Sequence, residues 1–343
     1  MRELPTNVIK KIYDLMGDDL SKYIFENRLM YSLTEDKKFI RNVVCTIEKG
    51  NEIYKFLKLN PKRKIIFGAG SVGKRLVRIY DDITFDCLVD NHCSGSTYMG
   101  LPIINIEELK EKYKEDVVII SAKRYHEEIM QQLLEEGFKK EAIINLGMEY
   151  EKLSHLQYFD LPQLRENQFN EEIFVDGGCY DGNTSLDFER WNLGNVGGGI
   201  YAWEPEPSNQ EKCRVLLEKN NINYEMIPKG LWNDTGVLKL KTDKDSSAIS
   251  IEGDLSIEVG SIDQMISKPV TFIKMDIEGA EYQAILGAQK TIKKHTPRLA
   301  ICVYHKLEDI WELPWLIHTI NPKYRFYLRH YSFGDVETVL YAL

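Results

Sequence analysis

The residues best suited to chemistry lie where apolar runs of this sequence end. The first run, EIFVDGG, ends at Asp176 and passes through Gly177 and Gly178 into a turn that closes with Gly182. Because glycine has no side chain, a ligand could lie against the backbone there, facing the amides of the turn and of the following helix N-terminus. The pattern indicates a ligand-binding turn at the end of a buried strand.

The second run, GIYAWEP, ends at Glu204. In a doubly wound parallel sheet successive strands end at the same edge, so we expect Glu204 one strand over from the glycines, where its carboxylate could bind a ribose diol. A solvated acid and an ordinary glycine turn would give the same local pattern, so a third element is needed to support the ligand site.

That third element is PVTFIKMDIEGAEYQAILGA, residues 269–288, in which Asp276 ends a strand and Glu278 and Gly279 form a turn. Like charges repel unless a cation or donor lies nearby, so the D-x-E-G-x-E cluster indicates a bound cation, and a sulfonium would be one. The carboxylates of Asp276, Glu278 and Glu281 could instead hold a divalent metal through oxygen ligands. No His or Asn completes that set, so we predict no metal.

An earlier glycine motif lies in the first half of the chain. Gly68, Gly70 and Gly73 follow the strand KIIF and open a helix, and Asp90 ends the next strand. This is the context of a dinucleotide fingerprint, in which the carboxylate accepts hydrogen bonds from ribose hydroxyls. The alternative is a domain that kept the fold without the ligand and uses its glycines for tight strand-to-helix packing. The sequence leaves both readings open.

The composition excludes several classes of protein. The chain has 343 residues, of which 43% are apolar and 28% charged, as in a soluble globular protein of about two domains. A net charge of -9 disfavours a nucleic-acid-binding surface. Six cysteines occur without a Cys-x-x-Cys pair, so we expect reduced thiols. No stretch approaches membrane-spanning length, so we expect a cytoplasmic protein without a membrane span.

Strands alternate with helices in both halves of the chain, which predicts an α/β protein with two Rossmann-like domains. Residues 1–60 carry helical apolar spacing and could cover a neighbouring domain or form a homodimer. Residues 61–150 form the first Rossmann-like domain, and residues 151–343 the second. We expect one long helix over GAEYQAILGAQKTIKKH, and an antiparallel hairpin, YRFYLRHYS and ETVLYAL, at the end of the second sheet.

Two resemblances extend this interpretation. The motifs DGGCYDGNTS, YAWEPEP, GLWNDTG, SIDQM and IKMDIEGAEYQAILGA, in this order, resemble the S-adenosylmethionine-dependent methyltransferases of the FkbM family over roughly residues 158–343. The chain departs from the commonest first motif of that family, in which Gly-Ala-Asn precedes the last glycine, because it has Gly178-Cys179-Tyr180-Asp181. The segment VDNHCSGSTYMGLPIINIEEL resembles the nucleotide-sugar-binding N-terminal domain of bacterial sugar acyltransferases, which implies a nucleotide-sugar ligand there.

The family resemblance implies a class I methyltransferase sheet with S-adenosyl-L-methionine as the methyl donor. It places the adenosyl group across the strand ends, where Gly177 and Gly178 let it approach. It also places Asp176 near the methionine amine, and Glu204 on the ribose.

Methyl transfer to oxygen also needs alignment and a proton acceptor. His305 ends a strand in AICVYH at the same edge and could act as a neutral base, as could Asp276 or Glu278. A capping or packing role for His305 is an equal alternative. Aromatic and basic residues on late strands could form the side that binds a sugar, although they could equally pack on a strand face: Tyr304, Arg329, His330 and Tyr331.

These observations predict an S-adenosylmethionine-dependent O-methyltransferase that acts on a hydroxyl of a carbohydrate, as in polysaccharide biosynthesis, or of another small biosynthetic intermediate. One alternative is an NAD-dependent nucleotide-sugar oxidoreductase that uses the first glycine motif, but no Tyr-x-x-x-Lys pair follows at a useful distance. Another is a non-catalytic module that only binds S-adenosylmethionine or a nucleotide. The fold carries a methyl donor and does not name the acceptor.

Overall fold

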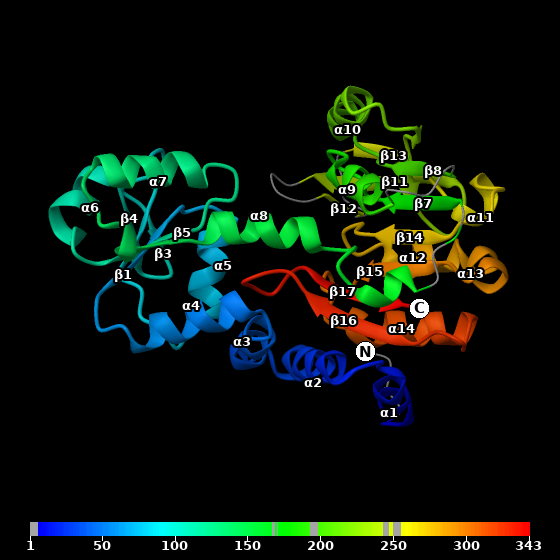
Figure 1. Cartoon of the computed structure of the whole chain (residues 1–343), viewed down its shortest axis with the longest axis horizontal. Coiled ribbons are helices and arrows are strands. Elements are labelled where there is room, and N and C mark those ends of the chain that lie inside the picture. The colour runs from blue at the N-terminus through cyan, green and yellow to red at the C-terminus, as the bar shows by residue number, and fades with distance from the viewer. Residues whose placement is uncertain (1–5, 167–168, 170, 193–197, 243–246, 250–254) are drawn as a thin grey trace. The chain divides into compact units, whose positions relative to one another are not determined.

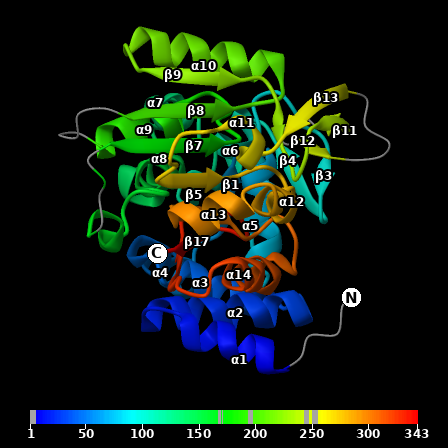
Figure 2. The same cartoon turned by 90° about the vertical axis from the view of Figure 1, so that its right-hand side faces the viewer.

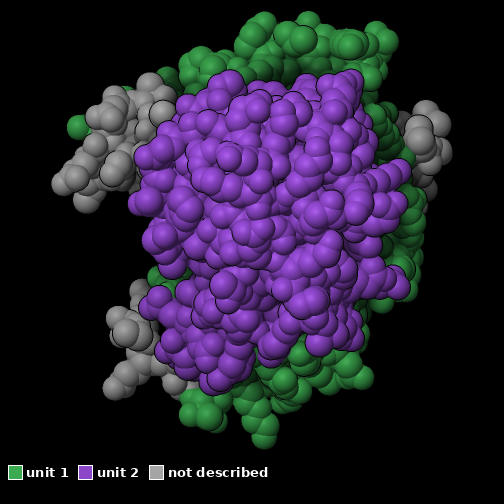
Figure 3. Space-filling model, turned by 90° about the vertical axis from the view of Figure 1, so that its left-hand side faces the viewer, with its two compact units in different colours: residues 1–29, 157–329, 337–343 green, residues 30–156, 330–336 purple. Residues whose placement is uncertain are grey.

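The computed structural model describes the chain except for residues 1–5, 167–168, 170, 193–197, 243–246 and 250–254. The chain divides into two compact units. Unit 1 comprises residues 1–29, 157–329 and 337–343, and unit 2 comprises residues 30–156 and 330–336 (Figure 3). The helices that precede residue 60 are therefore shared between the units, with α2 (Asp19–Thr34) beginning in unit 1 and ending in unit 2.

Unit 2 is built on a parallel sheet. Its described elements are α3 (Lys37–Val44), α4 (Glu48–Leu59), β1 (Lys64–Phe67), α5 (Ser71–Ile79), β2 (Cys87–Val89), β3 (Thr97–Tyr98), β4 (Leu101–Ile104), α6 (Ile106–Tyr113), β5 (Val117–Ile120), α7 (His126–Glu135), a 3-10 turn (Lys140–Ala142), β6 (Ile143–Asn145) and α8 (Leu146–Leu156). The strands lie in the order β3-β4-β2-β1-β5-β6, and β3 alone among these described strands runs antiparallel to its neighbour.

The side chains of the central strand alternate between two cores, as a sheet covered on both faces requires. Ile66 of β1 belongs to the core formed with α3, α4, α5 and α8, whereas Ile65 and Phe67 belong to the core formed with α6 and α7. The first of these cores also contains Phe333, from the segment 330–336. The Rossmann-like fold predicted for this part of the chain is confirmed (Figure 1).

Unit 1 contains the longer sheet. Its described elements are α1 (Thr6–Leu15), a 3-10 turn (Pro162–Arg165), β7 (Glu172–Gly177), α9 (Asn183–Trp191), β8 (Gly198–Trp203), α10 (Pro207–Lys219), β9 (Tyr224–Ile227), β10 (Gly230–Leu231), β11 (Gly236–Thr242), β12 (Ser247–Ile249), β13 (Leu255–Gly260), α11 (Ile262–Met265), β14 (Phe272–Met275), α12 (Glu281–Leu286), α13 (Gln289–His295), β15 (Arg298–Cys302), α14 (Asp309–Ile320), β16 (Phe326–His330) and β17 (Thr338–Ala342).

The described strands of the main sheet in unit 1 lie in the order β16-β17-β15-β14-β7-β8-β9. The strands from β15 to β9 pair in parallel, and β17 runs antiparallel to β15. Arg325 and Leu343, which flank β16 and β17, exchange two backbone hydrogen bonds of 2.8 and 3.0 Å, so the predicted antiparallel hairpin is confirmed. A smaller sheet, β10-β13-β11-β12, is inserted between β9 and β14 and was not anticipated from the sequence.

Helices of unit 1 pack on this sheet through aromatic and aliphatic side chains. An aromatic cluster joins α9 to β7 and β14, with ring centroids 4.2 to 6.4 Å apart; it consists of Phe159, Phe174, Phe188, Trp191 and Phe272. Figure 2 shows α12, α13 and α14 side by side, and contacts join α14 to both of the others. The single helix predicted over residues 279–295 is wrong, because the chain breaks it at Gly287 into α12 and α13. Each described helix is too short or too polar to span a bilayer.

Candidate functional site

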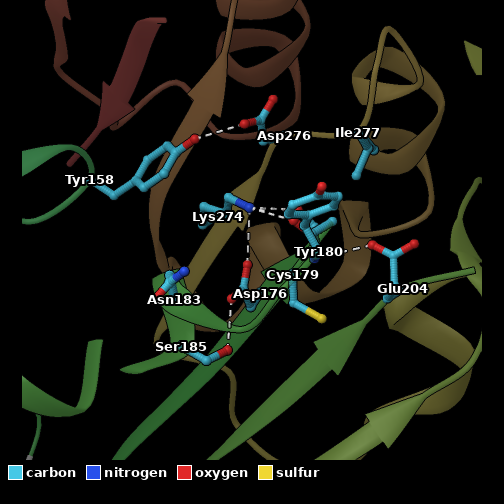
Figure 4. A network of polar contacts seen from close by, with 12 residues as sticks. Tyr158, Asp176, Cys179, Tyr180, Asn183, Ser185, Glu204, Lys274, Asp276 and Ile277 are labelled. Atoms are coloured by element: carbon cyan, nitrogen blue, oxygen red, sulfur yellow. Dashed lines mark hydrogen bonds and ion pairs between the residues drawn. The ribbon is translucent and has the colours of Figure 1, made fainter. Parts of the chain in front are cut away.

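Register brings the three predicted strand ends to one edge of the sheet in unit 1. Gly177 at the end of β7 is paired with Met275 at the end of β14 and with Trp203 at the end of β8. Glu204 and Asp276 each come directly after one of these paired residues. The prediction that the glycine motif and both acids share one sheet edge is therefore confirmed, and Figure 4 shows Glu204 and Asp276 on either side of Cys179 and Tyr180.

The turn at residues 177–182, here called the glycine turn, is packed against the protein's own backbone. Gly178 has φ +72°, and a Cβ there would overlap the carbonyl oxygen of Asp276. A Cβ on Gly177 would lie 2.5 Å from the Leu231 side chain, and one on Gly182, at φ +86°, would lie 3.0 Å from the Cys213 sulfur. The space that the missing side chains leave is thus filled by neighbouring protein groups. We expected a ligand to occupy the space beside these glycines, and the structure corrects this expectation because protein atoms occupy it.

Four amides of the glycine turn are already engaged. The N–H groups of Gly178 and Cys179 both donate to the Trp203 carbonyl at 3.0 Å, and the Gly182 N–H donates to the Cys179 carbonyl at 2.8 Å. The Tyr180 N–H donates to Glu204 Oε2 at 3.1 Å. A phosphate needs several backbone N–H groups directed at it. This turn is therefore poorly suited to a dinucleotide pyrophosphate, and better suited to a ligand without phosphate.

Cys179 and Tyr180, which depart from the commonest family motif, differ in burial. Cys179 is buried, and its sulfur lies 3.5 Å from that of Cys213 in α10. Tyr180 is exposed, with φ +49°, and Lys212 lies over its ring. The cysteine therefore packs the turn against α10, while the tyrosine faces outward.

Glu204 is a buried carboxylate at the end of β8, with only 6% of the residue exposed. Oε2 accepts from Tyr180, and Oε1 accepts from the Glu206 N–H at 2.9 Å. Burial raises the pKa of Glu204, which backbone donors partly offset. The Asn209 side chain also hydrogen-bonds this carboxylate. A carboxylate has about four acceptor sites, so Glu204 can still accept a hydrogen bond from a diol.

Asp176 forms an ion pair with Lys274, a residue that the sequence analysis missed. Asp176 is fully buried, accepting from Lys274 Nζ at 3.0 Å and from the Ser185 hydroxyl at 2.7 Å. Burial alone would lower the pKa of Lys274, but the carboxylates of Asp176 and Asp276 outweigh it and hold the pKa above its usual range. A lone lysine in the apolar run FIKM, two residues before Asp276, is the signal that could have identified it.

Asp276 is held by two tyrosines. Its Oδ2 accepts from the Tyr158 hydroxyl at 3.0 Å, and its Oδ1 accepts from the Tyr304 hydroxyl at 3.1 Å. Burial opposes ionisation, but the charges of His305 and Lys274 and the two hydroxyls keep the pKa of Asp276 below its usual value. Asp276 is therefore an oriented carboxylate at the sheet edge, one quarter exposed.

His305 is the centre of the acidic cluster. Its Nδ1 lies 3.0 Å from Glu281 Oε1, and its Nε2 lies 3.3 Å from Asp276 Oδ1 and 3.6 Å from Glu278 Oε2. These are ion-pair distances, although neither ring nitrogen is aligned for a hydrogen bond. Burial would lower the pKa of His305, but the three carboxylates raise it to about 10.

The expected role of His305 as a neutral base must therefore be corrected. A histidine with a pKa near 10 is already protonated at neutral pH, so it cannot accept a proton from a substrate. His305 is also the cation that the D-x-E-G-x-E pattern required, so the pattern alone does not demand a bound cation. In the described part of the chain, no group of His, Cys, Asp and Glu is arranged to hold a metal ion.

Glu278 is the carboxylate that remains accessible. Its side chain is 41% exposed, and the residue lies in the turn between β14 and α12 with φ +55°. Partial burial, with the neighbouring charges of Asp276 and Glu281, raises the pKa of Glu278 to about 7, although His305 opposes the shift. A carboxylate with this pKa can accept a proton near neutral pH.

Of the four residues predicted to bind the methyl acceptor, one lies at the sheet edge and three lie elsewhere. Tyr304 lies at the sheet edge and bonds Asp276. Arg329 instead pairs with Asp18 at 2.7 Å, so its guanidinium holds the start of α2. His330 and Tyr331 are buried and belong to the segment 330–336 of unit 2. For these three residues, the packing alternative describes what the structure shows.

The first glycine motif lies in unit 2. A Cβ on Gly73 would overlap the Gly68 carbonyl, so these two glycines serve close packing, whereas the Cβ direction of Gly70 is open. The Asp90 carboxylate accepts from the amides of Ala69, His92 and Cys93 at 2.9 to 3.3 Å. Asp90 thus organises its own loop, and a nucleotide or nucleotide-sugar ligand at this motif stays a prediction.

Comparison with known proteins agrees with the fold. Residues 176–340 match the family model of the methyltransferase FkbM domain, and residues 60–144 match a model described as C2185-like, N-terminal. The chain is similar to the structure of the methyltransferase FkbM from Methylobacillus flagellatus KT, with 21% identity and a TM-score of 0.52, over 85% of this chain and 93% of that one. No curated protein matches the chain.

Other solved structures are more distant. Fibrillarin from Aeropyrum pernix, in complex with S-adenosyl-L-methionine, has 11% identity and a TM-score of 0.36, over 57% of this chain and 76% of that one. A putative rRNA methylase from Clostridium thermocellum has 13% identity and a TM-score of 0.34, over 56% and 92%.

The sheet order and the match over residues 176–340 define a class I methyltransferase. That part of the chain is an FkbM methyltransferase domain, whose methyl donor is S-adenosylmethionine. The residues present fit this donor, because Glu204 offers buried carboxylate oxygens to a ribose diol and the engaged amides of the glycine turn suit a ligand without phosphate. The predicted fold class, enzyme class and cofactor are thereby confirmed.

Proposed function

We propose that the FkbM domain methylates a hydroxyl of a carbohydrate or of another small biosynthetic intermediate, with Glu278 as the general base. The observation that carries this proposal is the contrast between Glu278 and its neighbours. Glu278 is exposed and has a pKa raised to about 7, whereas Asp276 is tied to two tyrosines and His305 is already protonated.

S-adenosylmethionine, when bound, supplies a methyl group made electrophilic by its sulfonium. The chain's residues then have separate tasks. Glu204 accepts hydrogen bonds from the ribose hydroxyls, and the ionised Asp276 orients groups at the strand edge. Asp176, predicted near the methionine amine, acts through Lys274 rather than by direct contact, because it is fully buried and forms an ion pair with that residue.

Glu278 would take the proton of the acceptor hydroxyl as the carbon–oxygen bond forms and the bond between the methyl carbon and the sulfur breaks, which leaves S-adenosylhomocysteine. The transfer needs the hydroxyl aligned with the methyl group and a base within hydrogen-bond reach. The imidazolium of His305, 3.6 Å from Glu278, keeps part of the Glu278 population ionised at neutral pH. Glu281 in turn fixes His305 from its other nitrogen.

The chemistry of the accessible groups favours a neutral, hydroxyl-rich acceptor. Carboxylates accept hydrogen bonds from hydroxyls, and the ring of Tyr304 beside them suits a sugar face. An anionic group, such as a sugar phosphate, would be repelled by Asp276 and Glu278. This argument supports a neutral sugar over a phosphorylated one.

The test combines a panel of acceptors with the Glu278→Gln variant. We expect release of S-adenosylhomocysteine with neutral saccharides, and little with their phosphates. Glu278→Gln should lower kcat about 100-fold or more, as the loss of a general base does, while S-adenosylhomocysteine binds as before. Glu308→Gln, which changes an exposed acid at the N-cap of α14, is the matched control and should keep full turnover.

Two outcomes would contradict the proposal. Unchanged kcat in Glu278→Gln would remove Glu278 as the base. Binding of S-adenosylhomocysteine without turnover of any acceptor would favour the non-catalytic module instead.

A further inference from the structure

We propose that Lys274 is a positioning residue that holds the glycine turn in its donor-binding shape before the donor arrives. The proposal rests on the assignment of the donor site above and deepens it. Lys274 is buried, with 2% of its side chain exposed, and lies in β14, two residues after Phe272 of the aromatic cluster. Figure 4 shows it at the centre of the polar network.

The ammonium group of Lys274 is fully satisfied by the turn and its strand. Lys274 and Asp176 are register partners on neighbouring parallel strands, so their side chains leave the sheet on the same face. Nζ donates to Asp176 Oδ1 at 3.0 Å and to the carbonyls of Gly177 and Gly178 at 3.1 and 2.8 Å. These are three acceptors for the three N–H groups of an ammonium.

The same two peptide units are held from their other side. The carbonyl of each glycine shares a peptide plane with the amide of the next residue, so the two groups point in opposite directions. The amides that follow, those of Gly178 and Cys179, both donate to the Trp203 carbonyl. Two successive peptide units are thus fixed between Lys274 and β8, and the next amide, that of Tyr180, reaches the ribose-binding candidate Glu204.

Without the ammonium, this arrangement would be unfavourable. The Gly177 carbonyl would keep the Asp276 N–H as a donor at 3.1 Å, but the Gly178 carbonyl would lose its donor. That carbonyl would then direct its partial negative charge at the buried Asp176 carboxylate. The turn would have to rotate the peptide unit between Gly178 and Cys179, and the contact between Tyr180 and Glu204 would move with it. Buried ion pairs seldom add net stability relative to apolar side chains, so the placement of this pair beneath the turn is better explained by its geometry.

The first experiment compares two charge-neutral double variants. Lys274→Met with Asp176→Asn removes the pair beneath the turn, and Arg298→Met with Glu172→Gln removes a second buried pair at the opposite end of the same sheet. We expect the first double variant to bind S-adenosylhomocysteine at least tenfold more weakly, by calorimetric titration. The second double variant should bind S-adenosylhomocysteine within about threefold of wild type, even if its Tm falls as much as that of the first. Equal affinities in the two double variants would overturn the proposal.

The second experiment needs no variant. If Lys274 holds the turn in advance, hydrogen exchange of the wild-type protein without ligand should show the amides of Gly178 and Cys179 as protected as those of β7. Fast exchange that slows only after S-adenosylhomocysteine is added would overturn the proposal, and this result decides it if the first double variant fails to fold. These results are distinguishable from a failure of the proposed function. If the proposed function is wrong, the wild-type protein will not methylate saccharides, but its hydrogen exchange will be unaffected.

Discussion

At the residue scale, His305 shows how a charge pattern in the sequence can be completed by a distant residue. The acids Asp276, Glu278 and Glu281 lie in one short motif, and a ligand sulfonium was one way to balance them. The cation comes instead from the loop that follows β15, the strand next to β14. Sequence spacing could place His305 at this edge, but the direction of its pKa shift depends on three contacts that only the folded chain defines.

This arrangement predicts a pH dependence of stability. A histidine whose pKa rises on folding stabilises the fold fully below its unfolded pKa of about 6.5, and that stabilisation is lost as pH rises through about 10. The difference in unfolding free energy between wild type and His305→Gln should therefore shrink between these values, by up to about 1.4 kcal/mol per pH unit. Denaturant unfolding across this range measures it.

His318→Gln is the control for that experiment. Burial lowers the pKa of His318, so its charge changes only below the range tested, and the stability difference from wild type should stay flat. A difference for His305→Gln that is equally flat would mean that His305 is not protonated in the folded protein.

At the scale of elements, the glycine turn illustrates which part of a motif the sequence can interpret. The glycines correctly predicted a turn at the end of β7, and the alternation of strands and helices correctly placed Glu204 and Asp276 at the same edge. What the glycines face could not be predicted, because it is the Asp276 carbonyl and Cys213, which are distant in sequence. Sequence alone offered an equally good account in which a ligand filled that space.

Gly178→Ala should therefore destabilise the protein for a reason unrelated to the donor. The methyl group would overlap the Asp276 carbonyl, and φ +72° is unfavourable for alanine, so we expect a loss of about 2 kcal/mol or more in the free energy of unfolding. Denaturant unfolding without ligand measures this. Gly199→Ala in β8, where a Cβ meets open space, should lose little. Equal losses at both positions would contradict the account.

The break between α12 and α13 is a second feature that could not be predicted from the sequence. The alanine-rich run continues helical spacing across Gly287, but a Cβ there would overlap the Trp232 carbonyl, and the Gly287 carbonyl accepts from the Asp263 N–H at 2.9 Å. The Asp263 carboxylate accepts from the amides of Lys290 and Thr291 at 2.8 Å, so it caps α13 from α11. A cap supplied by a residue so far away leaves no local signal.

Asp263→Ala should lower the free energy of unfolding by about 0.5 to 2 kcal/mol, the usual effect of losing an N-terminal cap. Asp263→Asn retains an oxygen acceptor and should recover much of that loss. Chemical denaturation of the two variants beside wild type measures the difference. An alanine variant as stable as wild type would show that α13 does not depend on this cap.

At the scale of the whole molecule, the two units are not separated by a single linker. The α/β class and both Rossmann-like sheets could be predicted from strand and helix alternation. The path of the chain could not, because residues 330–336 lie between two strands of the sheet in unit 1 yet belong to unit 2. Two residues of this segment, His330 and Tyr331, were among those predicted to bind the methyl acceptor. In the structure the segment instead packs in unit 2, where Tyr150 lies edge-on against Phe333 at 5.0 Å and Arg75 pairs with Asp335 at 2.9 Å.

Phe333 is therefore expected to behave as a core residue of unit 2. It is 1% exposed, so Phe333→Ala should destabilise that unit by about 3 to 5 kcal/mol, measured as faster hydrogen exchange of the β1 and β5 amides. Phe85→Ala, which truncates another phenylalanine of the same core, is the matched control and should have a similar effect. Because each unit has its own core, affinity for S-adenosylhomocysteine should change by less than about threefold in both variants. A fall in affinity confined to Phe333→Ala would instead show that the segment 330–336 couples the stability of unit 2 to the donor site, through the strands β16 and β17 that flank it.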